Sequence, residues 1–273
     1  MARLTPDEIQ NFQSAIFENF RTNGRAFPWR ETRDPYRIMV SEIMLQQTQT
    51  ERVVSKYLEW LDFFPTLEAL ADAPFSEVLA HWVGLGYNRR ARYLQESAKL
   101  LIEKYQGVYP PDPDELDALP GIGPYTARAI STFVFNIPHA FIETNIRAVY
   151  IFFFFPEPDS VTETDILDLV KETLYSADPR TWYYALMDYG AALKKKVTNP
   201  NRKSLQYRKQ SRFDGSLRQA RGAIVRFLSA GRCASLDLVA LSDNLPQERL
   251  ERAARALVAE GLVCEKDGVY RIS

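Results

Sequence analysis

The stretch "LPGIGPYTARAI", residues 119–130, decides the fold. Gly121 and Gly123 flank a single isoleucine, and glycine accepts the positive φ angles that tight turns require. Pro124 follows at once, and proline is favoured in the first turn of a helix. The preceding "DPDELDALP" (112–120) is typical of a short acidic helix. The pattern therefore predicts two helices joined by a Gly-x-Gly turn, whose outward N–H groups and helix N-terminus suit a phosphate.

The composition around this stretch is that of a soluble globular protein. The 273 residues are 46% hydrophobic and 25% charged, enough for one large or two smaller domains. The longest aromatic run, "IFFFFP" (151–156), is far too short to cross a bilayer. Because the first residues lack a secretory signal core, we expect a cytoplasmic protein, associated with the nucleoid if the source is bacterial or archaeal. We also expect a monomer without membrane contacts. Two cysteines, Cys233 and Cys264, are too few for a disulfide framework or a four-cysteine metal site.

The charge is unevenly distributed along the chain. The formal net charge is −1, yet residues 194–232 hold twelve Lys or Arg residues against one acid, Asp214. A basic block in an otherwise acidic chain indicates local contact with a polyanion. The alternative is a solvated linker that happens to be basic.

Apolar residues at helical spacing fill the chain from residue 5 to about residue 190. The predicted helical runs lie at 5–23, 36–64, 66–72, 75–82, 87–105, 113–118, 124–136, 144–155, 162–176 and 180–193. No β-rich run interrupts them. We therefore predict a mainly α protein with an all-α domain over residues 1–193, a basic linker over 194–215 and a small domain over 216–273.

The small domain has the pattern of a winged helix-turn-helix. Three helical runs precede "LVCEKDGVYRI" (262–272), in which two short strand-like runs flank a Lys-Asp-Gly turn. The third run carries Arg249, Arg252 and Arg255, which suits a DNA-contacting helix. It also carries acidic residues, namely Glu248, Glu251 and Glu260. A protein-docking or packing module is the alternative.

Six motifs in the helical part occur in a characteristic order. They are "FPWR" (27–30), "DPYRIMVSEIMLQQTQ" (34–49), "GLGYNRRAR" (84–92), "LPGIGPYTARAI" (119–130), "ETNIRAVY" (143–150) and "MDYGA" (187–191). This set resembles the MutY-type adenine DNA glycosylases of the helix-hairpin-helix base-excision superfamily, over about residues 5 to 195. The resemblance implies the helix-hairpin-helix DNA glycosylase fold and a monofunctional base excision repair enzyme. Such an enzyme hydrolyses the N-glycosidic bond of a flipped, mispaired adenine, so the implied partner is double-stranded DNA with a mismatched or damaged base.

The resemblance assigns two carboxyl groups to the reaction. One carboxylic acid protonates the departing base and a second carboxylate faces the oxocarbenium-like sugar, as in glycoside cleavage. By motif match Glu42, flanked by apolar Val40, Ile43 and Met44, donates the proton to the purine N7. The family has aspartate where this chain has Glu143. A displacement of about 1 Å can cost on the order of 10²-fold in rate, so we expect the backbone to compensate; a different substrate or reduced activity are the alternatives.

A third catalytic position, Tyr125, bears on the reaction type. Bifunctional members of the superfamily have a nucleophilic lysine there, and a tyrosine cannot form an imine. The resemblance therefore implies little AP-lyase activity. Gln47 and Tyr87 match positions that enter the duplex beside the flipped base. Trp29 and Arg30 match the pocket entrance, and the other DNA contacts we expect are Arg89, Gly121, Gly123, Arg147, Lys194, Lys195 and Lys196.

The resemblance also bears on bound groups and substrate. The hairpin carbonyls of Asp117, Leu119 and Ile122 match a monovalent cation site, for K⁺ or Na⁺. The four cysteines that bind the family's iron–sulfur cluster do not follow "MDYGA", so we expect no cluster. The family's 8-oxoguanine-reading domain is replaced by residues 216–273. A glycosylase for uracil or thymine in mismatches or for a deaminated purine, and a non-catalytic binder of damaged DNA, therefore remain alternatives.

Overall fold

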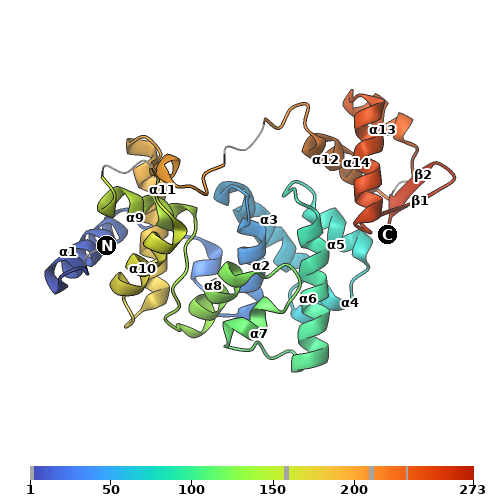
Figure 1. The fold of residues 1–273 in the computed structure, drawn as a ribbon. Helices are drawn as coiled ribbons and strands as arrows, with labels where there is room; N and C mark the ends of the chain where they lie inside the picture. The colour runs from blue at the N-terminus through green and yellow to red at the C-terminus, as the bar shows by residue number, and fades with distance from the viewer. Residues whose placement is uncertain (1–2, 157–159, 209–211, 232) are drawn as a thin grey trace. The chain divides into compact units, whose positions relative to one another are not determined.

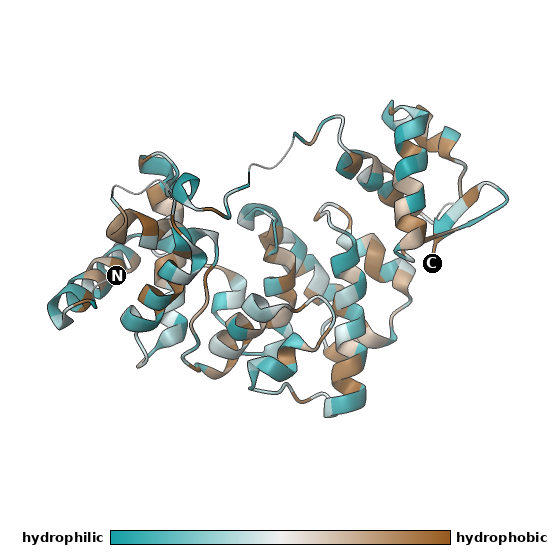
Figure 2. Cartoon of the chain, viewed as in Figure 1, coloured by the Kyte–Doolittle hydropathy of each residue, from teal (hydrophilic) through white to brown (hydrophobic). Residues whose placement is uncertain are grey.

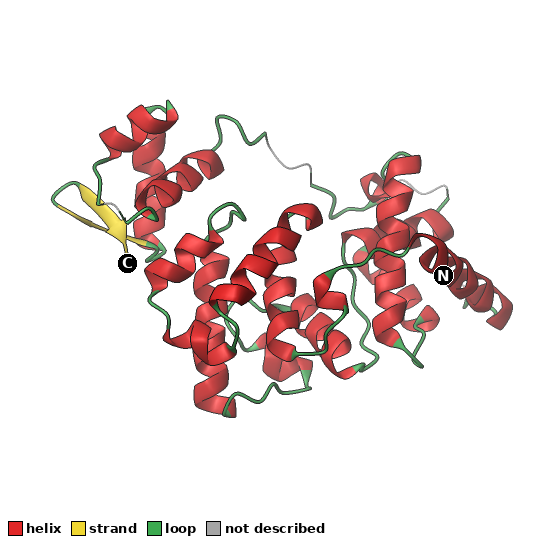
Figure 3. Cartoon of the chain, turned by 180° about the vertical axis from the view of Figure 1, so that it is seen from behind, coloured by secondary structure: helices red, strands yellow, loops and turns green. Residues whose placement is uncertain are grey.

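The computed structural model describes residues 3–156, 160–208, 212–231 and 233–273, and in these the chain is mainly helical (Figures 1 and 3). The helices of the first 110 residues are α1 (Pro6–Asn23), η1 (Pro28–Arg30), α2 (Pro35–Leu45), α3 (Thr50–Phe63), α4 (Leu67–Asp72), α5 (Phe75–Trp82) and α6 (Arg89–Tyr105). There follow α7 (Pro113–Asp117), α8 (Pro124–Phe135), α9 (Thr144–Phe154), α10 (Glu163–Thr173), α11 (Pro179–Lys196) and η2 (Pro200–Lys203). The last elements are α12 (Leu217–Leu228), α13 (Leu236–Asp243), α14 (Gln247–Ala259), β1 (Val263–Lys266) and β2 (Val269–Ile272).

Short polar side chains determine where several helices begin. Thr5 forms a capping box with Glu8 at the start of α1, and Thr162 forms one with Asp165 at the start of α10. In each box the hydroxyl accepts from the third helical N–H while the acid accepts from the cap N–H, which satisfies two otherwise unpaired donors. Asp178 caps α11 and is followed by proline. These local signals explain why the sequence predicts the helix starts well.

The chain forms two compact units, each assembled from separate segments. The first unit contains Met1–Ile38, Pro111–Asp117 and Ile122–Lys209. The second contains Met39–Pro110, Ala118–Gly121 and Gln210–Ser273. The chain therefore leaves and re-enters each unit, and neither unit is a continuous stretch of sequence.

Aromatic rings dominate the core of the first unit. Phe12 of α1 lies edge-on to Tyr150, Phe153, Phe154 and Trp182, with ring centroids 5.0 to 5.8 Å apart. Edge-to-face pairs of this kind stabilise beyond the area that they bury. Helix α11 packs against both α1 and α9. It therefore joins the beginning of the chain to its middle.

The core of the second unit contains Trp60 and Trp82, both fully buried and edge-on at 5.5 Å. Helix α6 packs against α4 and α5. Each of the longer helices combines an apolar side with a polar side (Figure 2). The buried stripe of α6, for example, contains Leu94, Ala98 and Leu101 at helical spacing.

The last part of the second unit contains three helices and a hairpin. Helix α12 packs against α13 and α14, with Ile224, Leu250 and Leu257 buried between them. Strands β1 and β2 are antiparallel, with Val263 opposite Ile272. Tyr270 also bridges to Ala234, just before α13. This order of elements is the one that the sequence predicts for residues 216–273.

Two features differ from the sequence-based prediction. The helical pattern over 36–64 is broken between α2 and α3, where Gln47 has a left-handed φ of 57°. Helix α11 continues through Lys196, and η2 follows within the predicted linker. There the Asn201 side chain donates to the Thr144 carbonyl at 2.9 Å, which attaches this segment to α9. No helix in the described ranges is long and apolar enough to span a bilayer.

Candidate active site

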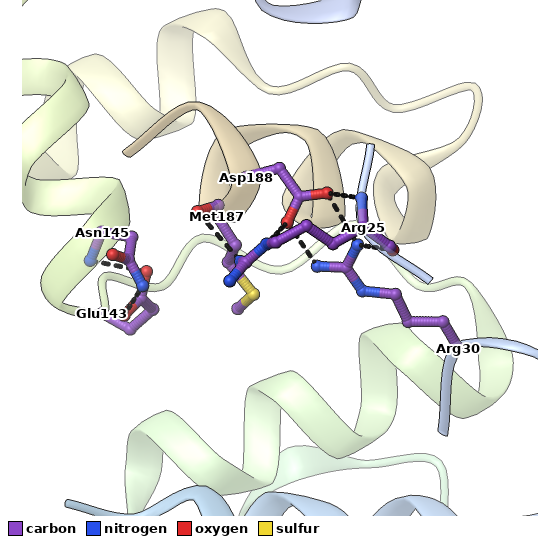
Figure 4. Close-up of polar contacts among 6 residues, drawn as sticks. All are labelled: Arg25, Arg30, Glu143, Asn145, Met187 and Asp188. Carbon is purple, nitrogen blue, oxygen red and sulfur yellow. Dashed lines mark hydrogen bonds and ion pairs between the residues drawn. The ribbon is translucent and has the colours of Figure 1, made fainter. Parts of the chain in front are cut away.

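Glu143 is the N-cap of α9, and its own side chain fixes its position (Figure 4). Oε1 accepts from the backbone N–H groups of Asn145 at 2.6 Å and Ile146 at 2.9 Å. Oε2 accepts from the Asn145 side-chain amide at 3.2 Å. The carboxylate therefore lies at the positive end of the helix dipole, where an anion is stabilised. The Glu143 side chain thus bends back onto its own helix.

Burial of Glu143 opposes its ionisation, whereas its polar neighbours favour it. Removal from bulk water raises the pKa of the Glu143 carboxyl above its ordinary value, against the lowering effects of the Asn145 and Ile146 N–H groups and of Lys194. Burial in turn lowers the pKa of Lys194, while the charge of Glu143 raises it. Lys194, expected from the sequence to contact DNA, thus interacts electrostatically with Glu143. Lys195 and Lys196 are exposed.

A second carboxylate of the first unit, Asp188 of α11, binds two guanidinium groups (Figure 4). Arg25 donates from Nε to Oδ1 at 2.7 Å and from its backbone N–H to Oδ2 at 2.8 Å. Arg30 donates to both carboxylate oxygens at 2.8 Å. Burial opposes ionisation of Asp188, but Arg30 and Arg25 together hold the pKa of this carboxyl below its usual value.

Arg30 is itself enclosed by aromatic rings. Its guanidinium carbon lies 4.5 Å from the Tyr184 ring centroid and 5.0 Å from that of Phe27. Phe27 stacks on Trp29, which is buried. The structure thus places Arg30 in a buried ion pair, and its contact with DNA stays a prediction. Arg147 similarly forms an ion pair with Glu163 at 3.0 Å.

Helices α9 and α11 approach each other closely at Gly190. A Cβ atom at this position would lie 2.3 Å from the carbonyl oxygen of Asn145. Real Cβ contacts are never so short, so only glycine fits here without movement of the backbone. Gly190 therefore permits the packing that sets the position of Asn145, the residue that supplies two donors to Glu143.

The turn of the helical hairpin also depends on a glycine. Gly121 has a left-handed φ of +74°, and a Cβ atom there would lie 2.7 Å from Cβ of Tyr93. Gly123 caps α8 with an extended backbone. Tyr125 follows in the first turn of α8, partly exposed, with its ring edge-on to Phe141 at 5.6 Å. The helix–turn–helix arrangement predicted from residues 112–130 is confirmed.

Glu42 lies on α2 within the second unit and is 8% exposed. Its flanking residues Val40, Ile43 and Met44, which the sequence identifies as apolar, are fully buried. The catalytic assignment of Glu42, which the motif match supplies, stays a prediction.

Two turns of the second unit present Gln47 and Tyr87. Both residues have left-handed backbones, with φ of 57° and 48°, and Tyr87 is 39% exposed. Non-glycine residues seldom adopt this conformation unless the surroundings impose it. Arg90 joins the two turns. Its guanidinium donates to carbonyls on both sides, including those of Gln46 at 2.7 Å and Gly86 at 2.9 Å.

Arg90 and Arg89 have different roles in the structure. Arg90 is buried, and desolvation lowers its pKa to about 10. It also donates to the carbonyls of Ile43 and Met44, at 2.8 and 2.9 Å. Arg89 is exposed, with its guanidinium 5.5 Å from the Tyr93 ring centroid. The exposed residue of the pair is the one that the sequence assigns to DNA contact.

Sequence reasoning did not identify four residues that shape the first unit's site: Arg25, Asn145, Asp188 and Gly190. Three of them lie inside the quoted motifs "ETNIRAVY" and "MDYGA". The pairing of Asp188 with two arginines spans about 160 positions. Nothing in the local sequence indicates which distant partner a buried carboxylate will have.

Comparison with known families and proteins points to DNA repair. The family described as "HhH-GPD superfamily base excision DNA repair protein" matches residues 40–178. A protein of Mycolicibacterium smegmatis named adenine DNA glycosylase is 35% identical over 260 residues, covering 88% of each chain. The Buchnera aphidicola (strain Bp) protein of that name is 36% identical over 187 residues. That match covers 67% of this chain but 52% of the relative, so the chain spans about half the length of that protein.

Solved structures give a similar result. A thermostable thymine-DNA glycosylase is 28% identical, with a TM-score of 0.61, covering 68% of this chain and 87% of that one. A trapped endonuclease III–DNA covalent intermediate has a TM-score of 0.53, covering 68% and 84% of the two chains. Its identity is 21%, so this likeness concerns the fold alone.

Proposed function

The chain belongs to the HhH-GPD superfamily of base excision DNA repair proteins, and we propose that it is a glycosylase that removes adenine from duplex DNA. Relatives named adenine DNA glycosylase match at 30 to 36% identity. The structural observation that carries the proposal is the Glu143 carboxylate, fixed at the N-terminus of α9 and interacting electrostatically with Lys194. This arrangement suits an anion that faces a developing positive charge.

The proposed reaction is hydrolysis of the bond between adenine and the deoxyribose C1′. Glu42 gives its proton to the purine, so that the base leaves with the electron pair of the broken bond. Glu143 stabilises the cationic sugar until a water oxygen bonds to C1′ and releases a proton. The base must first leave the stack, at a cost of about a few kcal/mol.

Glutamate at position 143 is compatible with this role because its additional length is taken up locally. The side chain bends back to accept from the N–H groups of Asn145 and Ile146. A longer side chain held in this way is restricted to one region beside its helix. This geometry supports the expectation that the backbone and side chain together compensate for the added methylene.

The experiment that tests the function is single-turnover incubation with a panel of duplexes. The panel contains adenine opposite 8-oxoguanine or guanine, and uracil, thymine or hypoxanthine in mismatches. We expect release of adenine, and loss of that release in Glu42→Gln. Release of a pyrimidine alone would contradict the proposal and would favour an activity like that of the similar thymine-DNA glycosylase. Binding without release of any base would indicate a non-catalytic protein.

We further propose that the enzyme leaves the DNA backbone intact. Tyr125 stands where a lysine would be needed to attack the sugar and form an imine. The test is incubation of the enzyme with substrate and borohydride, followed by separation of covalent adducts. We expect no trapped complex in wild-type protein, whereas Tyr125→Lys provides a nucleophile for comparison. Efficient trapping by the wild-type protein would overturn this assignment.

Two statements about bound groups complete the proposal. Backbone carbonyls are oxygen donors suited to hard cations, so Asp117, Leu119 and Ile122 would hold K⁺ or Na⁺ beside the hairpin turn. We also propose that the protein contains no iron–sulfur cluster, because the sequence has two cysteines. Duplex affinity in chloride salts of potassium, sodium and tetramethylammonium tests the first statement. Iron analysis of the purified protein tests the second.

For residues 216–273 we propose a winged helix-turn-helix domain. Three helices followed by a β-hairpin support this assignment, as does the antiparallel bridge between Ala234 and Tyr270, which ties the segment before α13 to the hairpin. The duplex that this enzyme acts on is the partner we propose for the domain.

A further inference from the structure

The second unit contains a groove, of about 950 Å³, between two segments far apart in sequence. One wall is formed by residues 46–52 and 83–90, and the other by Phe213 and helix α12. Its charged lining comprises Arg52, Arg89, Arg90, Arg218, Arg221, Arg226 and Glu260. We call this feature the basic groove.

Some charges of the basic groove are used within the protein. Arg221 donates to both oxygens of Glu260, at 2.9 and 2.5 Å, which neutralises the acid. Arg226 pairs with Asp243 but its side chain remains 59% exposed. Arg52 and Arg89 are exposed on the opposite wall. With Glu260 and Asp243 both counted against the six arginines, the groove keeps a positive excess on both walls.

The two walls are joined by a specific contact. Arg92 of α6 donates to the carbonyl of Gly261, directly after α14. Gly261 has a φ of +67°, and a Cβ atom there would lie 2.9 Å from an Arg92 nitrogen. Glu260, the residue before Gly261, pairs with Arg221 and so connects α12 to the same end of α14. Specific side-chain contacts therefore hold the two walls of the basic groove together.

The chemistry of the basic groove fits one class of ligand. Repeated guanidinium groups on two walls suit a polyanion with regularly spaced single charges, as in the sugar–phosphate backbone. Tyr87 and Phe213, which are 39% and 56% exposed, offer ring faces on which bases can stack. Helix α14, which the sequence indicates as the DNA-contacting helix, alternates Arg249, Arg252 and Arg255 with Glu248 and Glu251, so its charge is nearly balanced.

We propose that the basic groove binds the sugar–phosphate backbone of one strand of the duplex, so that α12, and not α14, carries the DNA contact of residues 216–273. The proposal rests on the function proposed above, since that duplex is the substrate. In this proposal residues 216–273 help to bind the DNA strand beside Gln47 and Tyr87. Recognition here is of backbone charge and is expected to be independent of sequence.

The experiment compares two variants that each remove two positive charges. Arg218→Gln/Arg226→Gln alters the basic groove, whereas Arg252→Gln/Arg255→Gln alters exposed positions of α14 outside it. The probe is a fluorescein-labelled duplex with a non-hydrolysable adenosine analogue, and its affinity is measured by anisotropy over a range of salt. Base release is measured separately, in single turnover with saturating enzyme and a normal adenine substrate.

We expect the groove variant to bind on the order of tenfold more weakly, with a salt slope reduced by about 1.8, since each phosphate contact contributes about 0.9. The α14 variant should bind as the wild type does. Equal or greater weakening in the α14 variant, or unchanged binding in the groove variant, would overturn the proposal.

A second variant guards against loss of folding. Arg52→Gln lies on the other wall and should lower the slope by about 0.9; an unchanged slope in a folded protein would count against the basic groove. Failure of the wild-type protein to release adenine would refute the proposed function. That result would leave the anisotropy comparison intact, so the two proposals fail separately.

Discussion

At the scale of single residues, Glu143 combines two conflicting properties. Its hydrogen bonds favour the carboxylate, while removal from water favours the neutral acid and raises its pKa. A reactive anion that faces a cationic sugar gains from weak hydration, because its field is less screened. The same desolvation reduces the stability of the folded protein whenever the group is ionised. Function and stability therefore make opposite demands on this position.

The first prediction concerns Glu143→Gln. We expect base release to fall by at least about 10²-fold, because the amide has no charge. The pKa of Glu143 is higher in the folded protein than in the unfolded chain. The neutral acid therefore stabilises the folded protein at low pH, and this stabilisation is lost as the pH rises through the folded-state pKa. The variant should therefore melt at a higher temperature than wild-type protein at neutral pH, and the difference should disappear in acid.

Calorimetry across the pH range measures this difference, with Glu103→Gln as the control at an exposed position of α6. A variant that melts below wild-type protein at neutral pH would show that capping of α9 outweighs desolvation. The same shift predicts that the rate of base release falls, on the acid side, at a pH above the ordinary range for glutamate. An acid limb at or below that range would contradict the assigned role of Glu143.

The second prediction concerns Asp188→Asn. The side chain is 1% exposed, and the change leaves the guanidinium groups of Arg25 and Arg30 without their counter-ion. Breaking a buried ion pair from one side costs about 3–5 kcal/mol. Because the pKa of Asp188 is lowered, its stabilisation is present above the unfolded pKa and is lost as the pH falls through the folded one. Urea unfolding at neutral pH measures the loss.

The two arginines provide an internal comparison for this site. The Arg30 side chain is 9% exposed and that of Arg25 is 34% exposed. Water compensates more readily for the loss of the exposed partner, so Arg30→Met should be more destabilising than Arg25→Met. The reverse order would show that the exposure of the arginine does not determine the loss of stability.

At the scale of elements, the contact between α9 and α11 is a third target. Gly190→Ala places a methyl group against the Asn145 carbonyl, at 2.3 Å in the undistorted backbone. The helices must separate, which moves the donors of Glu143. Because a displacement of about 1 Å can cost on the order of 10²-fold in rate, we expect slow base release from a protein with nearly normal helical content. Single-turnover kinetics and circular dichroism measure the two effects.

Gly222→Ala is the matched control for folding, since it adds the same methyl group to a helix with nothing within 4 Å. Alanine has the higher helix propensity, so its melting temperature should rise slightly. Equal base release in Gly190→Ala and wild-type protein would show that the contact between α9 and α11 does not determine the position of Glu143.

The elements themselves follow closely from the sequence where local signals exist. Pro124, the capping residue Thr162 and the left-handed Gly121 all act within a few residues, and the sequence predicts the helices that they begin or end. The break after α2 is not predicted, because Gln47 gives no local sign of a left-handed backbone. It is imposed by Arg90, more than forty residues away, which donates to the Gln46 carbonyl at 2.7 Å.

The candidate site is predictable to a similar degree. Motif matching predicts Glu42, Tyr125 and Glu143 as site residues, since each stands in a recognisable local context. It does not find the Asp188 cluster, whose partners come from residues 25 and 30. The capping role of Glu143 is also not predicted. The sequence shows glutamate at position 143, where the family has aspartate. It does not show where the additional methylene is accommodated.

At the scale of the whole molecule, each compact unit is built from separate stretches of chain. Helix α1 contributes Phe12 to an aromatic cluster whose other rings come from α9 and α11. The fourth prediction is that Phe12→Ala destabilises the protein by about 3–5 kcal/mol, the usual cost of truncating a buried aromatic residue. Urea unfolding followed by tryptophan fluorescence measures the loss, because Trp182 adjoins the Phe12 ring.

Phe63→Ala is the comparison for this experiment, since Phe63 is 58% exposed whereas Phe12 is 4% exposed. Its replacement should change the free energy of unfolding much less. Similar losses in the two variants would indicate that α1 contributes little to the stability of the first unit. A core that depends on Phe12 also means that residues 6–23 cannot be removed without unfolding this unit.

This interleaving has a consequence for the synthesis of the protein on the ribosome. Helix α1 leaves the exit tunnel long before α11, which is synthesised more than 150 residues later. At about 5–20 residues per second, the wait lasts roughly 8 to 30 s. Until α9 emerges, late in that interval, the apolar side of α1 has no native surface to cover it. Nascent chains should therefore recruit chaperones early, and slow translation ought to increase their misfolding.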